Sequence, residues 1–125
     1  MADPVRILVV DDDPSQLDIL TRLLTRLGYV VDTVDSPFGA TNEARKFKPD
    51  LVLLDVDMPA IPGDKLIRLL RANAPVPGMR IVLFSSTDQD TLRTLARDAG
   101  ADGWISKTFD PAELKRAIAQ HAPAR

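Results

Sequence analysis

The stretch LVLLDVDMP, residues 51–59, places four consecutive apolar residues directly before an aspartate, with a proline at its end. A continuous apolar run of this kind is typical of a strand buried on both faces, as in a parallel sheet. Pro59 has no amide hydrogen to donate, so the chain is expected to leave the sheet by that residue. Asp55 is therefore predicted at the carboxyl end of a central strand, where ligands bind in open α/β sheets.

Short apolar runs alternate with segments of helical periodicity along the rest of the chain. Besides the run at Leu51, strands are expected at residues 5–10, 29–34, 80–84 and 103–106. Three helix starts carry a capping residue before proline, at Asp13-Pro14, Ser36-Pro37 and Asp110-Pro111. Two further helices are marked by apolar residues at helical spacing, Leu66, Leu69 and Leu70 in the first and Leu92, Leu95, Ala96 and Ala99 in the second.

This alternation predicts an α/β protein with a parallel sheet and helices on both faces. The strand at residues 29–34 is short and contains polar residues, so it belongs at a sheet edge. A flavodoxin-like, doubly wound sheet of five strands in the order 2-1-3-4-5, with five helices, fits this pattern.

Composition and charge exclude several classes of protein. The chain has 125 residues, 45% of them hydrophobic and 27% charged, which suits one folded domain spanning residues 1–125. The net charge of −2 gives no support for nucleic-acid binding. The absence of cysteine excludes disulfides and thiol catalysis and fits a reducing cytosol. With no signal peptide and no apolar run of the ~18 residues that cross a bilayer, we expect a cytoplasmic protein without membrane contacts.

Polar side chains follow four strands that the predicted order makes neighbours. They are Asp11 and Asp12, Asp55, Ser85 and Lys107. Because the carboxyl ends of parallel strands share one edge of the sheet, these side chains are expected to gather there.

Three carboxylates at one edge repel each other, and two unit charges about 4 Å apart cost on the order of 4 kcal/mol at an effective dielectric constant of 20. A divalent cation would remove that cost, and a set of hard oxygen ligands suits Mg²⁺ better than zinc. A carboxylate beside Mg²⁺ can attack phosphorus as a nucleophile. Phosphoryl transfer also needs cations and donors around the phosphoryl oxygens, which Lys107 and Ser85 would supply.

The arrangement resembles the CheY-like receiver domain of two-component response regulators, over nearly the whole chain. Four motifs carry the resemblance: VVDDD at residues 9–13, LDVDMP at residues 54–59 with Gly63 after it, FSS at residues 84–86 and GADGWISK at residues 100–107. Each motif alone is weak, but their order and their places at the strand ends are specific.

The resemblance implies a phosphorylation-controlled signalling switch rather than an enzyme. Asp55 would accept a phosphoryl group from a histidine kinase or a phosphotransfer protein. Mg²⁺ would be held by Asp11, Asp12 and Asp55 with the backbone carbonyl of Asp57.

The resemblance also implies how the signal leaves the site. Ser85 would move to hold the phosphoryl group, Lys107 would pair with it, and Trp104 would be the aromatic switch. Residues 88–121 would form the face whose affinity for an unknown downstream protein changes. Such a protein is expected to be a monomer or a weak homodimer.

Two residues depart from the family pattern. Thr108 stands where proline usually follows the lysine, often with a cis bond; because a cis bond before a residue other than proline costs roughly 2.5–4 kcal/mol, a trans Lys107–Thr108 bond is predicted. Such a bond could shift Lys107 and weaken signalling. Asp57 adds a charge near the site, at a position where the family varies.

Two other functions compete with the phosphorylated switch. Thr108 is the only support for a pseudo-receiver, a protein-binding scaffold that works without phosphate. Asp55-Val56-Asp57 looks superficially like the nucleophile motif of haloacid-dehalogenase-type phosphatases, but Pro59 stands where that motif needs a hydroxyl residue.

Three residues can also be interpreted as structural or surface residues without a functional role. Asp13 is interpreted as a helix cap only, and His121 as a solvated side chain. Trp104 could be an anchor of an edge strand instead of a switch.

Overall fold

The computed structural model describes residues 3–57 and 62–123. Within these residues, strands and helices alternate in the order β1 (Arg6–Val10), α1 (Pro14–Arg26), β2 (Val30–Val34), α2 (Pro37–Phe47), β3 (Leu51–Leu54), α3 (Gly63–Asn73), β4 (Arg80–Ser85), α4 (Gln89–Ala99), β5 (Gly103–Ser106) and α5 (Pro111–His121). The strand bounds differ from the predicted ones by one residue at Val5, Tyr29 and Ser85. The predicted exit from the sheet at Pro59 lies outside the described residues.

The strands form one parallel sheet in the order β2-β1-β3-β4-β5, as predicted. β3 lies at its centre, and all four of its residues are buried. β2 lies at the edge, where each of its residues is only half-buried. The polar residues that placed it there, Asp32 and Thr33, are compatible with that exposure.

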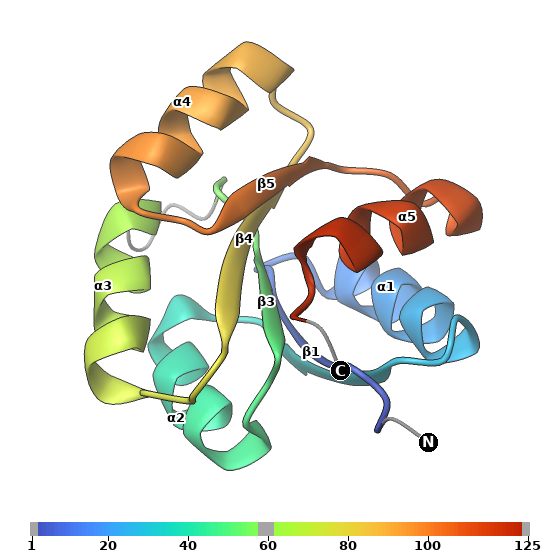
Figure 1. Ribbon diagram of the computed structural model, residues 1–125, viewed down its shortest axis with the longest axis horizontal. Coiled ribbons are helices and arrows are strands. Elements are labelled where there is room, and N and C mark those ends of the chain that lie inside the picture. The colour runs from blue at the N-terminus through green and yellow to red at the C-terminus, as the bar shows by residue number, and fades with distance from the viewer. Residues whose placement is uncertain (1–2, 58–61, 124–125) are drawn as a thin grey trace.

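Two layers of helices cover the sheet, with α1 and α5 on one face and α2, α3 and α4 on the other (Figure 1). The apolar core is divided in the same way. One cluster joins alternate strand residues such as Leu8 and Leu54 to α2, α3 and α4. The other joins residues such as Val9 and Leu53 to α1 and α5. Because successive residues of a strand point to opposite faces, a continuous apolar run supplies both clusters.

The predicted capping residues begin their helices. Asp13 accepts a hydrogen bond from the backbone N–H of Ser15, Ser36 from that of Phe38 and Asp110 from that of Glu113. The interpretation of Asp13 as a helix cap is therefore confirmed. None of the described helices is long and apolar enough to cross a bilayer.

Leu69 and Leu95 are exceptions to the predicted apolar faces, since 37% and 42% of their surfaces are exposed. In α3 the buried stripe consists of Leu66, Ile67 and Leu70. At about 100° per residue, Leu69 falls at the border of that stripe. Leu95 has the same position relative to Leu92 and Ala96, which are the buried residues of α4.

The interpretation of His121 as a solvated side chain was wrong. Its ring is half-buried and lies against Gly103 of β5, so closely that a Cβ atom at position 103 would come within 2.6 Å of Nδ1. Burial, with the nearby charge of Arg80, lowers the pKa of His121 below its usual value. The signal missed in the sequence is the glycine in β5, which leaves room for a ring from α5.

Candidate functional site

Two buried carboxylates stand at the carboxyl edge of the sheet. Asp11 directly follows β1 and Asp55 directly follows β3. The backbone N–H of Asp55 donates to the carbonyl of Val10 at 3.0 Å, which continues the pairing of the two strands by one residue. The Asp11 and Asp55 residues are 2% and 6% exposed. The sheet backbone therefore fixes both carboxylates on neighbouring strands.

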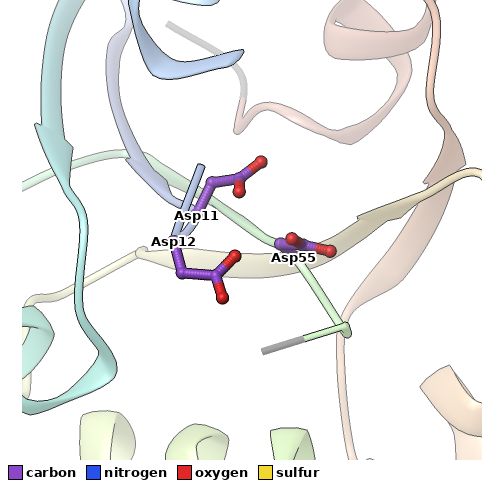
Figure 2. A group of neighbouring side chains, drawn as sticks. All are labelled: Asp11, Asp12 and Asp55. Atoms are coloured by element: carbon purple, nitrogen blue, oxygen red, sulfur yellow. The ribbon is translucent and has the colours of Figure 1, made fainter. Parts of the chain in front are cut away.

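Asp12 adds a third carboxylate from the solvent side. One carboxylate oxygen from each of Asp11, Asp12 and Asp55 lies within 4.8 Å of the others. Figure 2 shows the three side chains gathered where β1 and β3 end. Three oxygen donors at this spacing, two of them buried, fit a hard divalent cation. The backbone N–H of Asp57 donates to Asp55 Oδ1 at 3.0 Å and orients that carboxylate.

Lys107 reaches this cluster from the end of β5. Its ammonium nitrogen lies 3.3 Å from Asp11 Oδ2 and 3.9 Å from Asp55 Oδ2, and its side chain is 11% exposed. Its backbone N–H donates to the carbonyl of Ser85 at 2.8 Å. The predicted meeting of Lys107 with the acids therefore occurs. One lysine offsets only part of the charge of three carboxylates, so the site favours a further cation.

Burial raises the pKa of Asp55 to about 6. The hydrogen bond from Asp57 and the charge of Lys107 act in the opposite direction, whereas the nearby Asp11 carboxyl raises the pKa further. Without a metal ion, the folded protein therefore holds Asp55 partly protonated at mildly acidic pH.

Ser85, at the end of β4, is fully buried. Its hydroxyl group donates to Thr87 Oγ1 at 3.0 Å and accepts from the Thr87 backbone N–H at 3.1 Å. The predicted phosphoryl ligand is thus engaged with Thr87 in this structure. The Ser-Ser-Thr sequence, with hydroxyls two residues apart, is the signal for this local turn.

Trp104 precedes Lys107 by three residues, and Thr108 directly follows it. Trp104 is half-buried and packs on the apolar cluster beneath α2, α3 and α4, and the guanidinium carbon of Arg93 lies 5.9 Å from its ring centroid. The described residues contain no cis peptide bond, so the predicted trans bond between Lys107 and Thr108 is confirmed.

A fold of this topology with acids and a lysine at the carboxyl edge defines a class, the receiver domain. The family model described as "Response regulator receiver domain" matches residues 7–119. The chain therefore belongs to the response regulator receiver domain family.

Two relatives support that assignment. The DNA-binding response regulator MtrA of Mycolicibacterium smegmatis is 38% identical over 109 residues, which are 87% of this chain and 46% of the relative. The chain thus spans about half the length of the first curated relatives it matches. Protein PilH of Pseudomonas aeruginosa is 31% identical over 113 residues, which are 90% of this chain and 93% of the relative.

One solved structure is also informative about the site. The receiver domain of the sensor histidine kinase PA1611 from Pseudomonas aeruginosa has a TM-score of 0.80 and 26% sequence identity, with 95% of this chain and 98% of that chain covered. That receiver domain was crystallised with a magnesium ion coordinated in its active site cleft.

Proposed function

We propose that this chain is a signalling switch that accepts a phosphoryl group on Asp55, in a Mg²⁺-dependent reaction, from a histidine kinase or a phosphotransfer protein. Phosphorylation would then change protein binding at the face formed by α4, β5 and α5. The observation that carries the proposal is the buried Asp55 carboxylate, which shares one cluster with Asp11 and Asp12 and has the Lys107 ammonium 3.9 Å away.

In the proposed reaction, a carboxylate oxygen of Asp55 attacks the phosphorus of a phosphohistidine. The oxygen–phosphorus bond forms, the nitrogen–phosphorus bond breaks, and the leaving imidazole takes up a proton. Asp11, Asp12 and Asp55, with the backbone carbonyl of Asp57, would hold the Mg²⁺ ion. When bound, Mg²⁺ supplies positive charge for the phosphoryl oxygens. The magnesium ion in the PA1611 relative supports this assignment.

Lys107 and Ser85 have distinct parts in this proposal. Lys107 is already among the acids and would pair with a phosphoryl oxygen, since its ammonium group offers three donors. Ser85 would have to exchange its bond to Thr87 for one to the phosphoryl group. That exchange would be the first movement of the switch. Trp104 lies in the neighbouring strand β5, two positions before its end, and would transmit the movement to the surface.

Intact-protein mass spectrometry after treatment with acetyl phosphate and Mg²⁺ tests the proposal. The unmodified sequence should gain the mass of one phosphoryl group, and Asp55→Ala should gain none. Asp18→Ala, which changes an exposed acid on α1, should be modified like the parent protein. Omission of Mg²⁺ with added chelator should prevent the reaction. Failure of the parent protein to react, with partner binding intact, would point to a scaffold that works without phosphate.

A further inference from the structure

The loop from β5 to α5 is closed by the side chain of Thr108. Its hydroxyl oxygen accepts a hydrogen bond from the backbone N–H of Asp110 at 3.1 Å. The same hydroxyl group donates to Glu113 Oε2 at 2.8 Å. Asp110 in turn caps α5 by accepting from the backbone N–H of Glu113 at 2.9 Å. These three bonds tie residue 108 to the first turn of a helix that packs on the sheet.

Lys107 lies between this loop closure and the sheet. On one side, its backbone N–H is bound to the carbonyl of Ser85. On the other side, the next residue, Thr108, is held to the first turn of α5 by the hydrogen bonds of its side chain. A threonine leaves its own φ angle free, whereas a proline would fix it. The hydrogen bonds of Thr108 therefore supply a restraint that the backbone at this position lacks.

We propose that Thr108 and Glu113 are positioning residues that act through Lys107. The Thr108–Glu113 hydrogen bond fixes the start of the loop, and this keeps the Lys107 ammonium group at its distances of 3.3 and 3.9 Å from Asp11 and Asp55. This inference rests on the proposed phosphorylation of Asp55, because its consequence is a faster transfer of the phosphoryl group.

Removal of either partner should slow Asp55 phosphorylation by acetyl phosphate about two- to fivefold, the effect of one exposed hydrogen bond. Thr108→Val removes the hydroxyl group at nearly constant volume. Glu113→Ala removes the acceptor and keeps the backbone N–H that binds Asp110. Thr108→Ser should restore the rate. The double variant should be no slower than Thr108→Val alone, since Thr108→Val already removes the bond to Glu113.

Thr21→Val is the matched control. The Thr21 hydroxyl group also makes one hydrogen bond, to the carbonyl of Leu17 at 2.7 Å within α1, and it lies on another element. This variant should be phosphorylated at the parent rate. Losses that simply add in the double variant of Thr108 and Glu113 would overturn the inference.

The Lys107→Ala background shows whether Thr108 acts through the lysine. There, Thr108→Val should cause no further change in rate, because the group that it positions is gone. A purely structural role of Thr108 would slow both backgrounds by the same factor, and that result would refute the inference.

A second measurement needs no phosphorylation. Amide hydrogen exchange at Lys107, followed by NMR in the metal-free protein, should be faster in Thr108→Val and Glu113→Ala than in the parent and in Thr21→Val. If the parent protein is not phosphorylated, the proposed function fails while this measurement still decides whether the bond holds the loop. Unchanged protection of the Lys107 amide would show that it does not.

Discussion

At the scale of single residues, burial sets the behaviour of Asp55. Its pKa is raised from 3.8 to about 6, so between these values the folded chain binds more protons than the unfolded chain. The stability that this carboxyl group contributes is fully present below pH 3.8 and is lost as the pH rises through 6. The cost of an ionised, buried carboxylate is thus present at neutral pH.

Asp55→Asn should therefore stabilise the metal-free protein at pH 7, by about 1–3 kcal/mol. Urea denaturation in the presence of a chelator, repeated between pH 4 and pH 7.5, measures the effect. The difference between variant and parent should grow as the pH rises through about 6. A difference that is constant over this range would show that burial does not raise the pKa of Asp55. Asp18→Asn, at an exposed site, should match the parent throughout.

Lys107 contributes the one protein cation that the structure places among these acids within the described residues. Lys107→Gln keeps most of the length of the side chain and removes its charge, so it should slow phosphorylation of Asp55 about 10- to 100-fold. Lys115→Gln, on the exposed surface of α5, is the control for loss of one positive charge. Rates of acetyl phosphate labelling measure both effects. A rate for Lys107→Gln equal to that of the parent protein would show that Lys107 takes no part in the reaction.

At the scale of elements, the contact between β5 and α5 depends on a glycine. A Cβ atom at position 103 would lie 2.6 Å from His121 Nδ1 and 2.7 Å from Cε1, so the ring would have to move. Gly103→Ala should lower the free energy of unfolding by about 1–2 kcal/mol, a typical cost of overpacking.

Three further variants identify the cause of that loss: His121→Ala, its double variant with Gly103→Ala, and Gly63→Ala. His121→Ala, combined with Gly103→Ala, should recover most of the stability, because the clashing ring is removed. Gly63→Ala is the control, since a Cβ atom at the start of α3 meets no atom of the described residues within 4 Å beyond its chain neighbours and its own helix. Urea denaturation of the parent protein, Gly103→Ala, His121→Ala, their double variant and Gly63→Ala measures the changes. A double variant that is as unstable as the sum of the single variants would contradict the proposed clash.

The elements also show which features could be predicted from sequence. Runs such as residues 51–54 and cap-proline pairs such as Asp13-Pro14 are local signals, and the structure confirms the elements they predicted. The gathering of Asp11, Asp55 and Lys107 followed from the strand order alone. The contact of His121 with Gly103 was missed, because it depends on how a whole helix is oriented on the sheet. The engagement of Ser85 with Thr87 depends on a rotamer, which sequence patterns do not determine.

At the scale of the whole molecule, one edge of the sheet collects charges from distant parts of the chain. Lys107 and Asp11 are 96 positions apart in sequence and 3.3 Å apart in space. A ligand that binds across β1 and β3 in the folded state has no comparable site in the unfolded chain. Its binding free energy therefore adds to the stability of the fold.

Mg²⁺ should accordingly raise the melting temperature of the protein, with a gain of about 2.7 kcal/mol at a concentration 100 times the dissociation constant. Asp12→Asn should abolish most of this gain, because in the proposed site Asp12 would supply a ligand. It should leave the chelator-treated protein nearly as stable as the parent, because Asp12 is exposed and does not fill the core. Asp18→Asn should keep the full gain. Thermal denaturation followed by circular dichroism over a series of Mg²⁺ concentrations measures all three proteins. If Asp12→Asn shows the same rise in melting temperature as the parent, then Mg²⁺ is stabilising the protein at some other place and the three-carboxylate site is not where it binds.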